Sequence, residues 1–423
     1  MAQMNAAAVA SITLEAVQEI IPDLVETDDT FDGLITDNGR AIRISPRGYR
    51  IPLKYAKPGS YSAGNLDGAA LPRGGGISLD NGSLTPQTLM LPVEWTKLVE
   101  LIGKKVDKVA VENVVDTTLA DAADNLKTIR DILLQTDGTG NLGTISGTVT
   151  SKVVNMTPSG FGARLLRPGQ KVDVYNGASQ RTNPTVTVTA ASWTNFLGGT
   201  QQFTYTETDP TSIGNGDIIR VTGLTSGAPV FIYGLPYFHS TSTSGTLLGI
   251  NRTNPYVVSN GYSLGGAQIS LPALRLLLNQ VKNRLGVKAL KGQFWQVHSS
   301  QLAAYEELGF ERQNYDISMK AEYPDMLFQG KARVGGFPVV ENIHADNSVW
   351  DFVAPKCWGK VKYGDGTFWY EIPGIGRIYP IYDTTTGAPD TAFGATLVDP
   401  LQYFCDNVLA GGRVSSCKTP AGN

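Results

Sequence analysis

Apolar residues recur at helical spacing between residues 106 and 135 and predict one long helix. They stand three or four positions apart: Val111, Val115, Leu119, Ala122, Leu126, Ile129 and Leu133. The charged residues off this stripe are expected to face water: Glu112, Asp116, Asp121, Asp124, Lys127 and Arg130. A helix of this length would span roughly 45 Å. Because no other stretch is as regular, we expect it to be the spine of the molecule.

Two more helices are predicted in the second half of the chain. The first runs from 270 to 285, with Ser270 as its cap, Pro272 in its first turn and Gly286 just beyond its end. The second runs from 299 to 308, between the strand-like runs GQFWQVHSS, GGFPVVENI and SVWDFVAP. This order of elements predicts an α/β unit attached to the spine. A weaker helical pattern covers residues 6 to 25.

Strand signals dominate the chain between residues 165 and 235. Runs such as KVDVYN, TVTVTAASW, QQFTYTET and GDIIRVTG alternate or are rich in β-branched residues, and turn signals separate them. They predict a small barrel or sandwich inserted after the spine. Residues 236 to 260 are expected to continue in extended form, and the chain from Tyr363 onward is again β and turn.

A long turn-rich stretch lies between residues 40 and 92, with strand-like pieces on both sides. The Asn81-Gly82 pair is typical of a hairpin turn. The stretch is locally basic through Arg43, Arg47, Arg50, Lys54, Lys57 and Arg73. A loop of this length cannot bury its own backbone. It is therefore either a solvated loop or one that becomes ordered on another subunit.

Composition excludes several classes of protein. Charged residues make up only 17% of the 423 residues, and 47 glycines and 23 prolines indicate many turns. The net charge of −3 does not suit a basic nucleic-acid binder. Three cysteines show neither metal-ligand spacing nor a disulfide framework, which favours synthesis in a reducing cytoplasm. We find no secretory signal and no apolar window long enough to cross a membrane.

The motifs that carry chemistry are weak. The glycine pattern from Gly138 to Gly143 follows a helix rather than a strand, so we interpret it as a turn and not a dinucleotide site. Residues 261–265 match GxSxG, so Ser263 could be a serine-hydrolase nucleophile, with Asp316 or Asp325 and then His344 completing a triad. A glycine-rich link separates this motif from the following helix, which does not suit a nucleophile elbow. We expect no enzyme activity, cofactor or metal.

The order of these parts resembles the major capsid proteins of tailed bacteriophages that have the HK97 fold. The resemblance covers most of the chain: a long loop, the helix at 106–135, its DGTGNLG ending, the β insertion, GLPYFH with SGTLLGINRTNPYV, QFWQVHSSQLAAYEELG and GGFPVVENI. It implies an α+β fold with an N-terminal arm, an extended loop, a spine helix, an axial domain and an inserted small β domain. The implied divisions are 1–39 for the arm, 40–97 for the loop, 98–164 for the peripheral domain with the spine, 165–235 for the insertion, 236–262 for peripheral strands, 263–350 for the axial domain, and 351–423 for return strands.

The resemblance also implies a function. Such a chain would assemble, as hexamers and pentamers, into an icosahedral shell around double-stranded DNA that it does not bind sequence-specifically. It would reside in the virion, and in the host cytoplasm during assembly, with a portal and possible scaffolding and cement proteins as partners and no membrane contact. Arg47, Lys54 and Lys57 of the loop would then contact an acidic surface of a neighbouring subunit, such as the spine. The alternative within the same fold is an encapsulin-like compartment.

Overall fold

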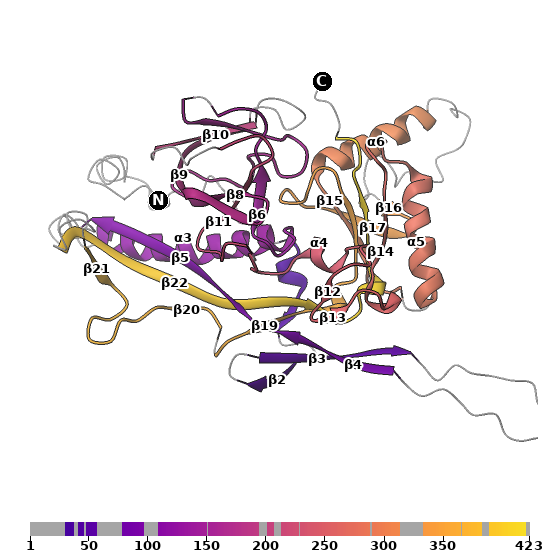
Figure 1. Ribbon diagram of the computed structural model, residues 1–423, viewed down its shortest axis with the longest axis horizontal. Helices are drawn as coiled ribbons and strands as arrows, with labels where there is room; N and C mark the ends of the chain where they lie inside the picture. Colours follow the sequence, from indigo (N-terminus) through magenta and orange to yellow (C-terminus); the bar gives the residue numbers. More distant parts are fainter. Residues whose placement is uncertain are drawn as a thin grey trace, which may run out of the picture.

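The computed structural model describes residues 30–37, 41–45, 48–56, 78–96, 109–149, 151–193, 201–206, 213–227, 229–287, 290–313, 333–364, 366–382 and 389–419. The helix expected at 6–25 lies outside these residues. Figure 1 shows one long helix crossing the molecule, a β module above it, a long curved strand below it and a mixed α/β unit at one end. The mixture of helices and strands confirms the expected α+β class. None of the described helices is long and apolar enough to cross a membrane.

The long helix is α3 (Val109–Leu134). Ala122, Leu126 and Leu133 of its predicted stripe are buried, which confirms the helical pattern over the second half of the helix. The prediction for Arg130 is wrong, because its side chain is 11% exposed and ion-paired. The chain leaves the helix through a turn in which Gly138 and Gly140 have positive φ angles. That turn confirms the reading of the glycine motif.

A six-stranded sheet lies alongside the spine. Its strands are β1 (Thr36–Asp37), β5 (Gln87–Thr96), β19 (Trp358–Lys362), β20 (Phe368–Trp369), β21 (Tyr379–Tyr382) and β22 (Pro389–Cys405). The long strand β22 forms the frame, since β5, β19, β20 and β21 all pair with it. Val93 and Trp95 of β5 pack with Ala122 of the spine and Ala395 of β22. We call this sheet the peripheral sheet.

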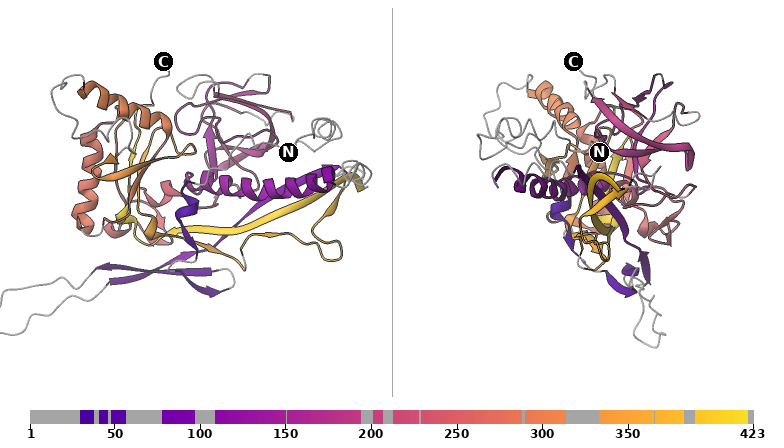
Figure 2. Two further views of the ribbon diagram at one scale, coloured as in Figure 1. Left: turned by 180° about the vertical axis from the view of Figure 1, so that it is seen from behind. Right: turned by 90° about the vertical axis from the view of Figure 1, so that its left-hand side faces the viewer.

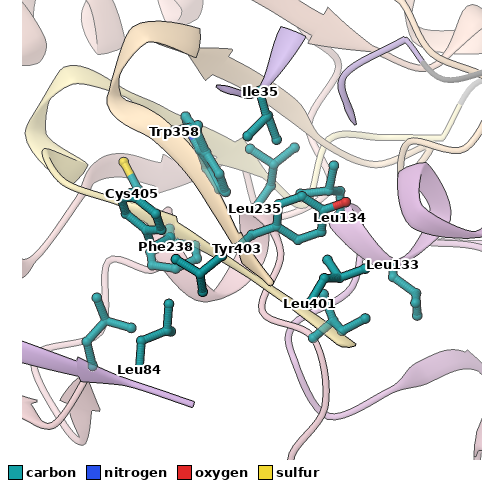
Figure 3. Packing of buried hydrophobic residues seen from close by; sticks show 14 of the residues in the cluster. Ile35, Leu84, Leu133, Leu134, Leu235, Phe238, Trp358, Leu401, Tyr403 and Cys405 are labelled. Atoms are coloured by element: carbon teal, nitrogen blue, oxygen red, sulfur yellow. The ribbon is translucent and has the colours of Figure 1, made fainter. Parts of the chain in front are cut away.

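The main apolar core joins segments from the whole length of the chain. Figure 3 shows Ile35, Leu84, Leu133, Leu134 and Leu235 gathered with Phe238, Trp358, Leu401, Tyr403 and Cys405. These residues come from six separate parts of the sequence, so the core is built from long-range contacts. Two short 3-10 helices contribute to the same region: η1 (Asp32–Leu34) and η6 (Val408–Ala410).

The β module is a closed barrel. Its strands are β6 (Asn141–Thr144), β7 (Val153–Met156), β8 (Lys171–Asn176), β9 (Ser179–Trp193), β10 (Gln201–Tyr205) and β11 (Ile218–Val221), in the order β6-β11-β8-β9-β10-β7. A bridge between Ile145 and Met156 joins the two outer strands. Closure pairs the two outer strands of the sheet with each other, and apolar side chains fill the interior. Two of these strands, β6 and β7, precede residue 165, at which the inserted domain was expected to begin.

The segment after the barrel departs from the extended form expected for residues 236 to 260. It contains the helical turn α4 (Leu235–Phe238), the small hairpin β12 (Thr246–Leu247) with β13 (Ile250–Asn251), and the 3-10 turn η2 (Pro255–Val257). Pro236 presets the first turn of α4. A Cβ on Gly234 would stand 2.3 Å from the carbonyl oxygen of Leu134, so glycine permits close packing on the end of the spine. The local prolines and glycine therefore outweigh the β-like composition.

The α/β unit at the other end is built on a second six-stranded sheet, the axial sheet. Its strand order is β14 (Asn260–Ser263), β23 (Gly412–Ser415), β18 (Trp350–Val353), β15 (Phe294–Val297), β17 (Phe337–Glu341) and β16 (Arg333–Val334). Helices α5 (Leu271–Leu285) and α6 (Ser299–Gln313) belong to the same unit, and η5 (Pro355–Cys357) follows β18. Both helices were predicted, and Leu274, Leu277 and Val281 of α5 are buried as its stripe requires.

Candidate assembly surfaces

A three-stranded sheet extends from the body of the molecule. It consists of β2 (Ile42–Ser45), β3 (Gly48–Ala56) and β4 (Ser78–Leu84), with β3 in the middle. Figure 2 shows it lying below the rest of the fold, with β3 and β4 directed away from the spine. We call it the projecting sheet. It occupies the turn-rich stretch for which the sequence left two interpretations.

The inner face of the projecting sheet is anchored to the body. Tyr49, Ile51 and Leu53 of β3 alternate into the main core and are buried, and Leu84 of β4 joins them. The hydroxyl of Tyr49 donates to the carbonyl oxygen of Lys362 at 2.7 Å. Burial of alternate residues is the pattern of a strand with one covered face. The base of this sheet is therefore fixed in the isolated subunit.

The turn predicted at Asn81-Gly82 is wrong, because both residues lie within β4 and pair with Pro52 and Ile51 of β3. The physical reason is packing. A Cβ on Gly82 would stand 3.1 Å from Cβ of Leu248, so glycine allows strand β4 to approach the β12–β13 turn. The amide of Ser83 then donates to the carbonyl oxygen of Leu248 at 2.8 Å.

The outer strand of the projecting sheet presents apolar and basic side chains to solvent. All four residues of β2 are exposed, with Ile42 at 59% and Ile44 at 54%. Arg43 of β2 and Arg50 of β3 are also exposed. Exposed isoleucines on an edge strand are a typical feature of surfaces that contact another chain.

The three predicted contact residues are placed only in part. Arg47 and Lys57 lie outside the described residues. Lys54 lies in β3, where its backbone pairs with Leu79 of β4, and its side chain is not described. On the spine, Asp121 and Asp124 are exposed, and Asp124 pairs with the exposed Lys127 at 2.8 Å. The contact between these groups stays a prediction.

The peripheral sheet carries a second exposed apolar surface. Met90 of β5 and Phe368 of β20 both stand opposite Val398 of β22, so the three side chains share one face of the sheet. Their neighbours Leu91, Leu397 and Trp369 point to the other face and pack in the core. Met90 is 62% exposed and Phe368 is 49% exposed. Four more exposed apolar residues lie in the β20–β21 region: Tyr370, Ile375, Ile378 and Tyr382. We call the surface formed by Met90 and Phe368 the outer apolar face.

A buried polar junction holds the spine against the peripheral sheet. Nε of Arg130 donates to a carboxylate oxygen of Asp399 at 2.7 Å, and Thr367 donates to the other oxygen at 2.9 Å. Asp32 accepts from the hydroxyl of Tyr403 at 2.5 Å and from Nζ of Lys360 at 3.3 Å. Burial opposes the charge on Arg130, but the hydrogen bond and the negative charge of Asp399 leave its pKa above the usual value.

Sequence reasoning did not find this junction, although one signal was present. Asp399 interrupts the apolar run TLVDPLQYF, and an acidic residue in a buried strand requires a partner. The partner was not recognisable because Arg130 and Asp399 are 269 positions apart.

The serine-hydrolase alternative is not supported by the positions of its residues. Ser263 is exposed at the end of β14, and its hydroxyl accepts from the amide of Gly265 at 3.2 Å. His344 is buried and follows β17, four strands away in the axial sheet. Four strand spacings amount to roughly 19 Å, so the two side chains cannot form a catalytic pair. Asp316 and Asp325 lie outside the described residues.

The surroundings of His298 fit a structural role. His298 is fully buried, and its Nδ1 lies 2.8 Å from the hydroxyl of Ser300 at the start of α6. Burial, with the nearby charge of Arg164, lowers the pKa of His298 to about 3, so it is neutral at neutral pH. Among the described residues, no group of three or more His, Cys, Asp or Glu side chains could hold a metal ion.

Comparison with known proteins supports the fold directly. No protein-family model and no curated protein sequence matches the chain. The capsid asymmetric unit of cyanophage A-1(L) matches it with a TM-score of 0.55 and 13% identity, covering 95% of this chain and 96% of that one. The capsid of a native GTA particle matches with a TM-score of 0.46, 8% identity and coverage of 98% and 100%. The SrpI encapsulin of Synechococcus elongatus PCC 7942 matches with a TM-score of 0.43, 8% identity and coverage of 98% and 97%. The match to the cyanophage capsid subunit shows that the chain has the HK97-like fold, as the order of its parts indicates.

Proposed function

We propose that this chain is the major capsid protein of a tailed bacteriophage, a structural subunit that assembles into an icosahedral shell. The observation that carries the proposal is the match to the cyanophage capsid subunit along nearly the whole of both chains. Two exposed surfaces support it. Ile42 and Ile44 lie on an edge strand of the projecting sheet, and Met90 and Phe368 lie on the outer apolar face. A chain that stayed alone would have little use for so much exposed apolar surface.

In this proposal many copies form hexamers and pentamers, and the shell encloses double-stranded DNA without reading its sequence. The projecting sheet of one copy lies on a neighbour, so that its arginines and lysines meet acidic groups of the neighbouring spine. A portal completes the particle, together with any scaffolding and cement proteins that it uses, and assembly takes place in the host cytoplasm. Because the cyanophage capsid gives a TM-score above 0.5 and the encapsulin does not, we prefer a phage shell to an encapsulin-like compartment.

The proposal is tested by sedimentation of the purified chain and of a Met90→Lys, Phe368→Lys variant. We expect the unchanged chain to form particles of megadalton size. The variant is expected to stay small with an unchanged circular dichroism spectrum, because charges on the outer apolar face cannot be desolvated in an interface. Thr182→Lys, an exposed change on the barrel, serves as the control and should assemble normally. Particle formation by the double variant would exclude the outer apolar face as an interface.

A further inference from the structure

The closed barrel is attached to the spine through apolar packing. Strand β6 follows directly on the turn that ends α3, and Ile132 of α3 belongs to the apolar core of the barrel together with Leu142 and Ile219. A Cβ on Gly143 would stand 2.8 Å from the carbonyl oxygen of Gly162, so the barrel wall is tightly packed beside this attachment. The barrel and the end of the spine therefore share one core.

A buried arginine attaches the barrel to the axial unit on its other side. Arg164 lies in the segment between β7 and β8 and is 7% exposed. Its guanidinium donates to the carbonyl oxygens of Ile343 at 3.1 Å and Ala345 at 3.0 Å, in the loop that follows strand β17 of the axial sheet. It also donates to Phe161 and Gly160 of its own segment, at 3.0 and 2.6 Å. One side chain thus binds four carbonyl oxygens on both sides of the contact.

The axial loop reaches back to the barrel segment. The side-chain oxygen of Asn347 accepts from the amide of Gly160 at 2.8 Å, and its nitrogen donates to the carbonyl oxygen of Pro158 at 3.0 Å. Burial lowers the pKa of Arg164 to about 10, so this group is still charged at neutral pH. Burying a guanidinium costs free energy unless its N–H groups are hydrogen-bonded. The contact therefore requires the carbonyl oxygens of the axial loop to stand in fixed positions around Arg164.

The same axial loop is bound by the spine. A carboxylate oxygen of Asp131 in α3 accepts from the side chain of Asn342 at 2.8 Å, and the other accepts from the amide of Phe31 at 3.0 Å. Asn342 in turn accepts from the amide of His344 at 2.8 Å. Spine, barrel and axial loop therefore form a closed triangle of contacts. A rotation of the axial sheet relative to the spine therefore has to break at least one of these three contacts.

We propose that the inserted barrel is an internal brace that fixes the axial sheet relative to the spine helix. Arg164 and Asn347 are its attachment to the axial loop, and Ile132 is its attachment to the spine. This function is a property of the single subunit, so it goes beyond the proposed shell function and does not depend on it. It also differs from a decorating role, for which a barrel would need no buried contacts to the axial loop.

The test is hydrogen–deuterium exchange of the isolated chain, with Arg164→Met and a matched control. Methionine keeps an apolar stem but removes every donor. Arg181→Met is the control, because Arg181 donates to Asp217 within the barrel, at 2.7 and 3.1 Å. In Arg164→Met we expect amides of residues 342–349 to exchange roughly ten- to a hundredfold faster, while β8 and β9 keep their protection. In the control we expect faster exchange within the barrel alone.

Two results would overturn the brace. One is unchanged exchange at 342–349 in Arg164→Met. The other is loss of protection in β8 and β9 together with that loop. That result would mean that Arg164 is needed for the barrel itself to fold. If Arg164→Met does not fold, Asn347→Ala removes the reciprocal hydrogen bonds and takes its place with the same expected pattern. Because the measurement uses unassembled chain, its outcome is separate from whether the chain forms shells.

Discussion

Arg130 in the spine helix and Asp399 in the long strand β22 form a hydrogen-bonded ion pair at 2.7 Å, and the carboxylate is completely buried. The pair joins the C-terminal turns of α3 to the middle of β22. Thr367 bonds to both side chains, at 2.7 Å to Arg130 and 2.9 Å to Asp399. The fold therefore depends on a buried charge pair as well as on its apolar core.

We predict that Asp399→Asn lowers the free energy of unfolding of the subunit by about 3 kcal/mol, because the buried guanidinium loses its hydrogen-bonded counter-charge and keeps only Asp32, 4.0 Å away. Urea denaturation of unassembled chain measures the change. Lys127→Ala is the comparison, since Lys127 and Asp124 form an exposed pair at 2.8 Å. It should cost no more than about 0.5 kcal/mol. Equal effects of the two substitutions would contradict a special role for the buried pair.

A second prediction concerns acid. Burial alone would raise the pKa of Asp351, but the charge and hydrogen bonds of Arg413, with the hydrogen bond from His239, hold it at about 2, below its ordinary value of 3.8. A carboxyl group whose pKa is lower in the folded state stabilises the fold above its unfolded pKa. Asp351 should therefore contribute about 2 kcal/mol above pH 4, and this contribution should disappear as the pH falls from 4 to 2.

Urea unfolding of the wild-type chain and of Asp351→Asn between pH 5 and pH 2 checks this prediction. The difference in unfolding free energy between the two proteins should shrink as the pH falls. A difference that is constant over that range would mean that Asp351 does not titrate with a lowered pKa.

The anchor of the projecting sheet gives a third prediction. Gly82→Val should push β4 away from Leu248 and weaken the hydrogen bond from the Ser83 amide, at a cost of roughly 1 to 3 kcal/mol. Faster exchange of the Ser83 amide would report the loss. Asn81→Val, at an exposed position of the same strand, is the matched control and should leave that amide protected. Protection of Ser83 in both variants would show that the glycine is not needed for the contact.

The fourth prediction concerns the basic residues of the same region. Replacing Arg47, Lys54 and Lys57 together with Glu should block assembly, because like charges would then face the acidic surface of a neighbour. The subunit should stay soluble and folded. A control with Glu at the exposed residues Lys171, Lys291 and Lys418 makes the same change in net charge and should assemble. Light scattering measures both variants, and normal shells from the first would refute the contact.

Sequence periodicity identified the elements that repeat a local pattern. The spine and α5 follow from apolar residues three and four positions apart, and α6 was expected from its place between strand-like runs. The β-branched runs separated by turns predicted the β module but left open whether it is a barrel or a sandwich. Local reasoning failed where a distant residue decides. Asn81-Gly82 has the composition of a turn, yet Leu248 makes it a strand.

The same limit applies to the candidate surfaces. A charged residue off a helical stripe normally faces water, and Asp124 does so. Arg130 does not, because it forms a buried ion pair with Asp399 of β22. The exposure of Met90 could not be read from β5 alone either, since it depends on which face of the peripheral sheet the spine covers. Pairings between distant segments are set by tertiary structure, which one sequence does not reveal.

The central claim is that this chain builds a closed shell. The most direct test is electron microscopy of the purified chain over a range of protein and salt concentrations. The account predicts closed particles of uniform diameter, in which neighbouring copies are joined through the projecting sheet and the outer apolar face. A chain that remains a folded monomer under all of these conditions would contradict it.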